Sequence, residues 1–307
     1  MGICEGRVVI VTGGGRGIGK GHSIEFARQG AKVVVNDLGK ERDDSGNAQP
    51  VAEQVVDEIK AMGGEAVANS SDVSDWNSAK EMIDQAYDEF GRLDVLVNNA
   101  GILRDRMLFN MDEAEWDAVI RVHLKGTFCP TRHALAKWRE LAKAGEELDN
   151  RIINTTSTSG LYANAGQANY GAAKSGIASF TIIAAKEVEK YGITVNAVSP
   201  GALTRMTEDL GMGRGQQPAE GEWSPRSPDN IAPIVAWLGS AESKGITGYI
   251  FESSGGRIGI SNNWSRGPSK QKEGRWDPAE LGPVVKEMVA EAVTPPGMGA
   301  DRRPRRG

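Results

Sequence analysis

Short apolar runs alternate with longer amphipathic stretches along the first 255 residues of the chain. Seven such runs are rich in Val, Ile or Ala and pass into glycine, asparagine, serine or proline, which is typical of buried strands. They are RVVIVTG (7–13), AKVVVND (31–37), EAVANSS (65–71), RLDVLVNNAG (92–101), RIINTTS (151–157), ITVNAVSPG (193–201) and GYIFES (248–253). Because helical patterns separate the runs, we expect βαβ units and an α/β fold with a doubly wound parallel sheet of about seven strands, covered by helices on both faces.

The segments that lack periodicity set the expected limits of the domain. Residues 39–50 and 201–227 are polar or glycine-rich, so we expect surface loops there, the second of them mobile. Beyond residue 255 the chain is rich in Gly, Pro, Ser and Arg and carries one short helical pattern over 278–293. We therefore expect one domain over residues 1–255 and a C-terminal extension over 256–307 that ends in a frayed, basic tail.

Two helix signals stand out in the middle of the chain. Asp112 and Glu115 have the spacing of a capping box, which predicts the start of a helix. Pro130 lacks the backbone N–H that a helix interior needs, so we expect it to kink or divide the helical region around it.

Composition and charge narrow the class of protein. Hydrophobic residues make up 39% of the chain and charged residues 25%, as in an ordinary globular protein with a real core. The net charge of −5 argues against nucleic acid as the main partner. The terminal RRPRR stretch keeps nucleic-acid binding open as an alternative, which predicts salt-dependent retention on DNA that truncation removes.

The cysteines, the histidines and the length of the apolar runs argue against a metal-binding, disulfide-linked or membrane-spanning protein. The two cysteines, Cys4 and Cys129, and three dispersed histidines form no metal-binding or disulfide pattern, so no metal is expected. No apolar run approaches the ~18 residues that span a bilayer. The start of the chain runs directly into the first strand without a charged leader segment, so we expect a cytoplasmic protein that does not insert into a membrane.

A glycine-rich turn joins the first expected strand to the first expected helix. The stretch TGGGRGIG (12–19) places Gly13, Gly17 and Gly19 where strand, turn and helix follow one another. Absent side chains let a diphosphate approach the backbone, and the helix start supplies free N–H groups and partial positive charge. Such a turn can be a plain connection, but this context favours a Rossmann-type dinucleotide site.

Asp37 ends the second expected strand, 18 residues after Gly19. A carboxylate at this point accepts hydrogen bonds from the adenosine ribose hydroxyls and repels a 2′-phosphate. Arg16 points to the opposite preference, because a guanidinium beside the turn binds phosphate well. We give Asp37 more weight, because the charge repulsion is costly whereas Arg16 can face solvent, and predict NAD as the cofactor in preference to NADP.

Tyr170 and Lys174 lie four residues apart in QANYGAAK and therefore share one face of an expected helix. Only Gly171, Ala172 and Ala173 separate them, which leaves room for a ligand to approach that face. An exposed helix pair would not need such small neighbours, so we expect both side chains to face a bound molecule.

Five motifs in this order resemble those of the short-chain dehydrogenase/reductase family. They are the turn at 12–19, Asn98-Asn99-Ala100-Gly101, Ser157, the Tyr170/Lys174 pair and Pro200-Gly201, and the resemblance covers about residues 5–255. Within the family, VVVNDLG (33–39), VHLKGTF (122–128) and GQANYGAAK (166–174) resemble the D-3-hydroxyacyl-CoA dehydrogenase unit of peroxisomal multifunctional enzyme type 2. That group includes 17β-hydroxysteroid dehydrogenases and bacterial enzymes of steroid-derived CoA thioesters.

The resemblance implies an NAD-dependent oxidoreductase that interconverts a secondary alcohol and a ketone. It implies that Tyr170 is the catalytic acid and base, that Lys174 holds the nicotinamide ribose and lowers the pKa of Tyr170, and that Ser157 orients the substrate oxygen. Cofactor contacts are implied for Gly13, Arg16, Gly17, Ile18, Gly19, Asp37, Asp72, Val73, Asn99, Ala100, Gly101, Tyr170, Lys174, Pro200, Gly201, Leu203 and Thr204. A homo-oligomer, dimer or tetramer, is also implied.

Three features depart from the family pattern. His123 stands where the family usually has an Asn that helps hold a water chained to the lysine; histidine can also donate and accept, so it is either a fourth catalytic residue or a packed helical side chain. Arg205 stands at a position often occupied by Thr, so the neighbouring Thr204 is the expected hydroxyl at the nicotinamide. The chain ends without Ser-Lys-Leu, which does not support a peroxisomal location.

The substrate is the open question of the sequence. A 3-hydroxyacyl-CoA thioester, including a steroid-derived one, and a 17β-hydroxysteroid fit the resemblance, and a small or polyketide-type carbonyl substrate of a ketoreductase is the alternative. A non-catalytic nucleotide-sensing scaffold is a further alternative, although such proteins tend to lose the tyrosine or the lysine. Leu161, Tyr162 and Trp223 are candidates for the substrate pocket, or else ordinary core residues.

Overall fold

The computed structural model describes residues 2–42, 48–202, 223–262 and 264–292. The chain forms two compact units, one of residues 1–261 and the other of residues 262–307.

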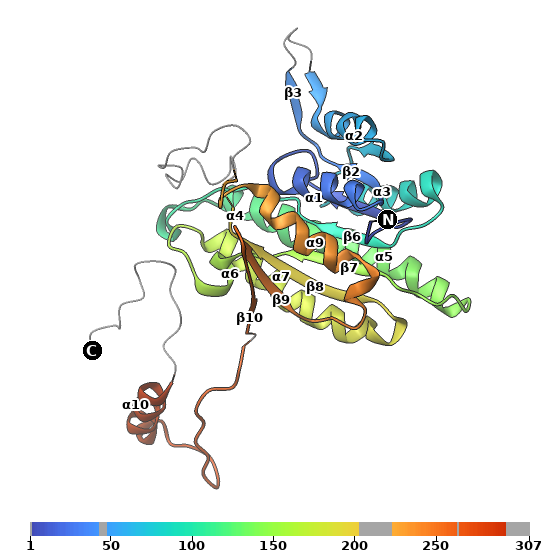
Figure 1. Ribbon diagram of the computed structural model, residues 1–307. Helices are drawn as coiled ribbons and strands as arrows, with labels where there is room; N and C mark the ends of the chain where they lie inside the picture. The colour runs from blue at the N-terminus through green and yellow to red at the C-terminus, as the bar shows by residue number, and fades with distance from the viewer. Residues whose placement is uncertain (1, 43–47, 203–222, 263, 293–307) are drawn as a thin grey trace. The chain divides into compact units, whose positions relative to one another are not determined.

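The first unit is built on an eight-stranded sheet in the order β10-β9-β8-β7-β6-β1-β2-β5 (Figure 1). Every neighbouring pair is parallel except β9 and β10, which are antiparallel. The strands are β1 (Val8–Thr12), β2 (Lys32–Asn36), β5 (Ala66–Asn69), β6 (Val95–Asn98), β7 (Arg151–Thr155), β8 (Thr194–Pro200), β9 (Ile250–Ser254) and β10 (Arg257–Ser261). The predicted Rossmann-type α/β fold is confirmed.

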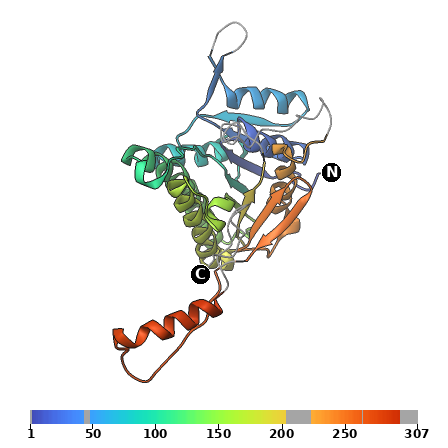
Figure 2. The ribbon, with the colours of Figure 1, turned by 90° about the vertical axis from the view of Figure 1, so that its left-hand side faces the viewer.

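Helices cover both faces of this sheet (Figure 2). Among the described residues of the first unit, the α-helices are α1 (Gly17–Arg28), α2 (Val51–Ala61), α3 (Trp76–Phe90), α4 (Glu113–Ile120), α5 (Gly126–Lys143), α6 (Thr158–Tyr162), α7 (Ala168–Val188) and α9 (Ala232–Gly239). Short 3-10 helices are η1 (Leu108–Asn110), η3 (Glu189–Tyr191), η5 (Pro228–Ile231) and η6 (Ala241–Ser243), and a π-helical turn, η2 (Arg121–Lys125), joins α4 to α5.

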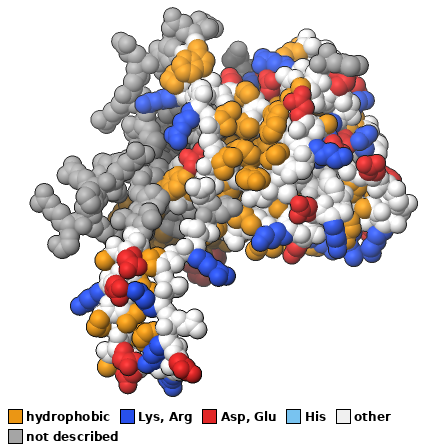
Figure 3. Space-filling model, turned by 60° about the horizontal axis from the view of Figure 1, so that its bottom comes forward, with side chains coloured by type: hydrophobic (Ala, Val, Ile, Leu, Met, Phe, Trp, Pro, Cys, Tyr) orange, Lys and Arg blue, Asp and Glu red, His pale blue; other side chains and the backbone are white. Residues whose placement is uncertain are grey.

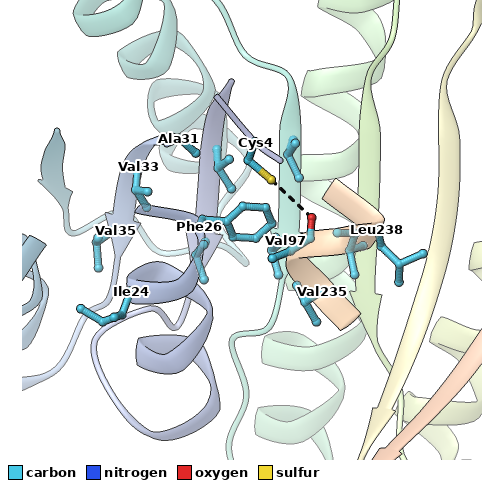
Figure 4. Packing of buried hydrophobic residues seen from close by; sticks show 14 of the residues in the cluster. Cys4, Ile24, Phe26, Ala31, Val33, Val35, Val97, Val235 and Leu238 are labelled. Carbon is cyan, nitrogen blue, oxygen red and sulfur yellow. Dashed lines mark hydrogen bonds between the residues drawn. The ribbon is translucent and has the colours of Figure 1, made fainter. Parts of the chain in front are cut away.

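The apolar runs form strands because both of their faces are buried. In β1, Val9 and Val11 pack with α1, α2 and α9, whereas Val8 and Ile10 pack with α3, α5 and α7 on the other face. Alternate side chains of a strand point to opposite faces, so a strand that is covered twice must be apolar throughout. Figure 4 shows the first of these clusters, in which Phe26 lies between strand and helix residues.

Three expectations about secondary structure were wrong. Residues 39–50 are not all loop, since β3 (Lys40–Arg42) and β4 (Ala48–Pro50) pair as a separate antiparallel ribbon. The sheet has an eighth strand, because β10 follows the strand that was predicted over 248–253. Pro130 lies within the continuous helix α5, and the break in regular α-helical geometry falls before it, at η2.

The described part of the second unit contains one short helical segment, as the pattern over 278–293 predicted. The 3-10 helix η7 (Pro278–Glu280) leads into α10 (Leu281–Glu291), and Asp277 caps the start of η7. Among the described residues of both units, no helix is long and apolar enough to cross a membrane.

Candidate active site

The topology gathers the predicted site residues at the carboxyl ends of the parallel strands. The chain leaves β1 toward β2 and β5 on one side and returns to β6 on the other side of β1. In such sheets ligands bind outside the carboxyl ends at this switch point. The turn at 12–19 follows β1, Asp37 follows β2, Asn99 follows β6, and Ser157 comes two residues after β7.

The glycine turn is as close-packed as the sequence predicted. A Cβ atom at Gly19 would lie 2.0 Å from the carbonyl oxygen of Gly13, and one at Gly13 would lie 2.8 Å from the Cα atom of Ala100. Gly13 and Gly17 have φ angles of 62° and 50°, in the left-handed region that favours glycine. The turn therefore brings bare backbone, and the N-terminus of the 12-residue α1 that begins at Gly17, to the open edge of the sheet.

A threonine that the sequence analysis did not single out ties this turn to the loop after β6. The Thr12 hydroxyl donates to the carbonyl of Val97 (3.2 Å) and accepts from the backbone N–H groups of Asn99 (2.9 Å) and Ala100 (3.1 Å). The Asn99 side chain donates in turn to the carbonyl of Thr12 (3.0 Å). These contacts fix the Asn99–Gly101 stretch against the glycine turn.

Asp37 is held by backbone groups on both of its carboxylate oxygens. Gly15 donates its N–H to Oδ2 (3.1 Å) and Gly39 donates to Oδ1 (2.7 Å). Arg16 is exposed, and its guanidinium donates to the carbonyl of Lys40 (3.0 Å). The carboxylate is therefore fixed beside the glycine turn. The guanidinium reaches over the segment after β2.

Asp72 and Val73 follow β5 but present different groups. The Asp72 carboxylate accepts from both the N–H and the hydroxyl of Ser74 (2.8 and 2.6 Å). Burial raises the pKa of Asp72, but the Ser74 hydrogen bonds and nearby Arg121 and Lys125 bring it below its usual value. The Val73 side chain is buried in the core, so only its backbone is available to a ligand.

Ser157, Tyr170 and Lys174 come together where α6 packs on α7. Ser157 is the N-cap of α6, and Tyr170 forms a hydrogen bond with it. The Lys174 ammonium lies 5.6 Å from the centre of the Tyr170 ring and donates to the carbonyl of Thr155 (2.7 Å). A Cβ atom at Gly160 would lie 2.6 Å from the backbone nitrogen of Ser175, so this glycine lets the two helices meet.

The electrostatics of this cluster differ from the expectation. Burial lowers the pKa of Lys174 to about 7. Burial raises the pKa of Tyr170; the Ser157 hydrogen bond lowers it and nearby Asp105 raises it again. The expected net lowering of the Tyr170 pKa is therefore wrong for the protein alone, because the loss of hydration dominates. Burial cannot be read from a four-residue spacing.

His123 lies in the π-helical turn η2, with its ring edge-to-face against Tyr170 at 5.1 Å between ring centres. Its Nε2 lies 2.7 Å from the carbonyl oxygen and 3.0 Å from the backbone nitrogen of Ile102, so the tautomer decides whether it donates to the first or accepts from the second. Its Nδ1 is buried without a hydrogen-bond partner among the described residues. A Cβ atom at Gly101 would lie 2.3 Å from the ring. Burial and the Lys174 charge, in that order, lower the pKa of His123 to about 3, so the ring is neutral at physiological pH.

Two buried polar networks lie around the site. Asn98 donates to Thr131 and Asn154 (both 2.9 Å), which links β6, α5 and β7. Gln167 accepts from the Ser159 hydroxyl (2.7 Å) and donates to Asp105 (2.7 Å), which joins α6, the N-cap of α7 and the loop after β6. The only sequence signal of these networks is the presence of polar residues within otherwise apolar or glycine-rich runs.

The remaining predicted residues fall into three groups. Pro200 ends β8, and the Gly201 N–H donates to the carbonyl of Ser253 (2.8 Å). Ile18 lies in the first turn of α1 and packs against the core. Leu203 and Thr204, together with Arg205 and most of the expected mobile loop, lie outside the described residues.

The three substrate-pocket candidates have different surroundings. Leu161 packs against a small core cluster of Ala178, Ala197 and Ile250. Tyr162 is half-buried with its hydroxyl hydrogen-bonded. Trp223 is exposed, and its indole N–H donates to Asn230 (3.2 Å). Within the described ranges, no cluster of three His, Cys, Asp or Glu side chains could hold a metal ion.

Comparisons with known proteins agree with this arrangement. Residues 7–214 match the family described as short chain dehydrogenase. The hydroxyacyl-CoA dehydrogenase ChsB1 of Mycobacterium tuberculosis is 40% identical over 293 residues, which is 93% of this chain and 89% of that protein. The mouse peroxisomal multifunctional enzyme type 2 is 42% identical over 262 residues, which is 85% of this chain but only 33% of the longer enzyme.

A solved structure is also similar along nearly the whole chain. The crystal structure of a short chain dehydrogenase from Mycobacterium avium has a TM-score of 0.88 and 51% sequence identity. The similarity covers 97% of this chain and 100% of that one.

Proposed function

Because the chain belongs to the short-chain dehydrogenase/reductase family, we propose that it interconverts a secondary alcohol and a ketone with NAD, and that its substrate is a 3-hydroxyacyl-CoA thioester. The observation that carries the proposal is the meeting of Ser157, Tyr170 and Lys174 at the carboxyl edge of the sheet that also carries the glycine turn. A 17β-hydroxysteroid is the second substrate class that the resemblance supports.

The residues around the turn fit a dinucleotide. The backbone at Gly13 and Gly17 and the start of α1 would hold the diphosphate, and Asp37 would accept from the adenosine ribose. The Asn99–Gly101 stretch, fixed by Thr12, would line the cofactor, and Pro200 and Gly201 would lie near the nicotinamide. When bound, NAD supplies the acceptor for the hydride that leaves the carbinol carbon.

Tyr170 moves the proton of the reaction in this proposal. In oxidation its phenolate oxygen takes the proton of the substrate hydroxyl, and Ser157 donates a hydrogen bond to the substrate oxygen as it becomes a carbonyl. In reduction the neutral phenol returns the proton. Burial lowers the pKa of Lys174 to about 7. As long as the lysine is protonated, its positive charge stabilises the Tyr170 phenolate. The positive nicotinamide ring would add to that stabilisation.

The protonation state of Tyr170 sets how the rate in each direction depends on pH. Burial holds Tyr170 protonated in the protein alone, and a protonated phenol is the proton donor that carbonyl reduction needs. Oxidation requires the phenolate and is therefore expected to speed up as pH rises above neutrality.

Asp37 supports NAD over NADP. Its two oxygens are fixed by Gly15 and Gly39, so the carboxylate cannot turn away from a 2′-phosphate without losing both hydrogen bonds. A dianionic phosphate beside a fixed carboxylate is repelled at short range in a partly buried site. Arg16 is the opposing charge, and it is engaged with the carbonyl of Lys40.

A substrate comparison tests the proposal. The purified protein is incubated with NAD and, separately, a 3-hydroxyacyl-CoA thioester, a 17β-hydroxysteroid and a small secondary alcohol, and NADH fluorescence is followed. The highest kcat/KM is expected for the thioester. A higher value for the steroid or the small alcohol would reassign the substrate, and no turnover with any of them in either direction would leave the scaffold reading.

A homo-oligomer is part of the proposal. Large apolar side chains are exposed on η1, α5 and α7, namely Leu108, Phe109, Phe128 and Ile183. On the face that Figure 3 turns forward, hydrophobic side chains gather in one area bordered by charged residues. Exposed apolar patches of this kind mark contact surfaces between proteins. A cytoplasmic location stays a prediction.

A further inference from the structure

The short helix α6 is fastened at both ends by different parts of the molecule. Its N-cap is Ser157, whose hydroxyl accepts from the N–H of Ser159 (3.2 Å). Its last residue, Tyr162, donates its hydroxyl proton to Glu252 on β9. The five residues of α6 extend over only ~7.5 Å, so a displacement at Tyr162 is felt at Ser157.

The Tyr162 hydroxyl has a second partner on another strand. Its oxygen lies 2.9 Å from the hydroxyl of Ser261 on β10. A phenol has one proton, and the Glu252 carboxylate can only accept, so Ser261 is the donor in this contact. Gly259 pairs with Glu252 in the β9–β10 ladder, which places both partners on neighbouring strands of the sheet edge.

The backbone is strained in the turn that follows Tyr162. Ala163 has φ 61° and ψ 145°, and it is the one non-glycine residue with positive φ within the described ranges. That region of backbone conformation is essentially restricted to glycine. Another residue adopts it only where contacts on both sides hold the backbone in place. Here the Tyr162 contacts act before the turn, and the Asn164 side chain, which donates to Gln167 (2.9 Å), acts after it.

We propose that Tyr162, held between Glu252 and Ser261, is a positioning residue that sets the orientation of α6 and thereby the placement of the Ser157 hydroxyl opposite Tyr170. The proposal rests on the function proposed above, because it assigns the contact a role in orienting the substrate oxygen. Tyr162 itself does not act on the substrate. Burial and the Glu252 hydrogen bond raise the pKa of Tyr162, so the hydroxyl keeps the proton that it donates.

Substitutions that remove one group at a time test this role in the full chain. Tyr162→Phe removes only the hydroxyl, and Glu252→Ala removes only its acceptor. Each is expected to lower kcat about tenfold, the change that ~1.4 kcal/mol of lost transition-state stabilisation produces. The dissociation constant of NADH should stay within about twofold of wild type, because the glycine turn is untouched. Tyr249→Phe, a half-exposed tyrosine next to β9, is the matched control.

The double variant and a conservative variant separate positioning from general loosening. Because both groups act through one contact, Tyr162→Phe combined with Glu252→Ala should lower kcat no further than about twofold beyond either single change. Glu252→Gln keeps an oxygen acceptor and should restore most of the activity. Unchanged kcat in Tyr162→Phe, multiplying effects in the double variant, or parallel losses of kcat and NADH affinity would each overturn the proposal.

Amide hydrogen exchange tests the role of Tyr162 independently of the proposed reaction. If wild type turns over no secondary alcohol or ketone, the proposed function fails, and amide exchange of residues 158–164 decides the fate of the contact. Faster exchange of these amides in Tyr162→Phe, with α1 unchanged, would show that Tyr162 holds α6. Equal exchange in both proteins would overturn the inference independently of any activity.

Discussion

The side of the site around the glycine turn is made almost wholly by backbone, whereas the side around α6 depends on pairs of side chains. At the turn, Gly19 fits against the carbonyl of Gly13, and Asp37 is held by two backbone N–H groups. At α6, Tyr162 reaches Glu252 and Ser261, 90 and 99 residues further along the chain. The path of the backbone at such a site depends mainly on the glycines and on where the strands end. A side-chain site can be changed one residue at a time.

The largest effect should come from filling the backbone side. Gly19→Ala would place a methyl group 2.0 Å from a carbonyl oxygen that cannot move freely. We expect the free energy of unfolding to fall by about 3 kcal/mol despite the higher helix propensity of alanine, with a loss of NADH affinity. Denaturant unfolding and NADH fluorescence titration measure the two effects.

The control for that change is Gly282→Ala in α10, where an added Cβ meets nothing within 4 Å. It should leave the NADH affinity as in wild type, and it should not lower the free energy of unfolding, because alanine is the better helix former. Wild-type NADH affinity in Gly19→Ala would contradict the close-packed turn.

Lys174 should make stability depend on pH in an unusual way. Its pKa is lowered from 10.5 to about 7 by burial, so between these values the unfolded chain binds more protons than the folded one. The stability of the cofactor-free protein should therefore rise with pH across this window, by up to about 1.4 kcal/mol per pH unit from this group.

Lys174→Met removes that term, because methionine carries no charge. We expect the variant to be the more stable protein at pH 7 and the advantage to shrink toward pH 10. Chemical unfolding of both proteins at several pH values measures the difference. A constant difference would show that the buried amine is not penalised.

A smaller effect is expected at Asp37. Asp37→Ser removes the fixed charge but keeps a short hydrogen-bonding group, so the ratio of kcat/KM with NAD to that with NADP should fall by about 10- to 100-fold. Asp57→Ser on α2 is the control, since that carboxylate is exposed on the helix surface. An unchanged ratio would show that Asp37 does not set the preference.

The smallest effect concerns the forced turn on the α6 side. Ala163→Gly relieves a backbone strain of roughly 1–3 kcal/mol and costs about 0.4–1 kcal/mol through the more flexible unfolded chain. We expect a net stabilisation of about 1 kcal/mol, seen as a higher Tm. A lower Tm would mean that alanine is not strained there.

The sequence predicted the parts of the molecule whose geometry is local. The strands, the glycine turn and the helix that carries Tyr170 and Lys174 follow from apolar periodicity and glycine spacing, and the capping box at Asp112 and Glu115 is present. The strand β10 was missed because RIGIS (257–261) is short, follows two glycines and lies at an edge with polar neighbours.

What the sequence could not show depends on contacts between distant residues or on burial. The Thr12, Gln167–Asp105 and Tyr162–Glu252 contacts join residues 62 to 90 positions apart, and nothing local marks either member of a pair. The π-helical turn at His123 and the direction of the Tyr170 pKa arise from packing around the site. Helices and strands depend mainly on neighbouring residues in the sequence, whereas the pKa values of buried groups depend on the tertiary structure.

The most direct test of the account compares wild type with Tyr170→Phe in steady-state kinetics with NAD and the best alcohol of the substrate comparison. The variant lacks only the oxygen that moves the proton, so kcat should fall by about 10²- to 10⁴-fold while NADH still binds. A Tyr170→Phe enzyme that retains wild-type kcat would contradict the assignment of the proton transfer to Tyr170, and with it the proposed mechanism.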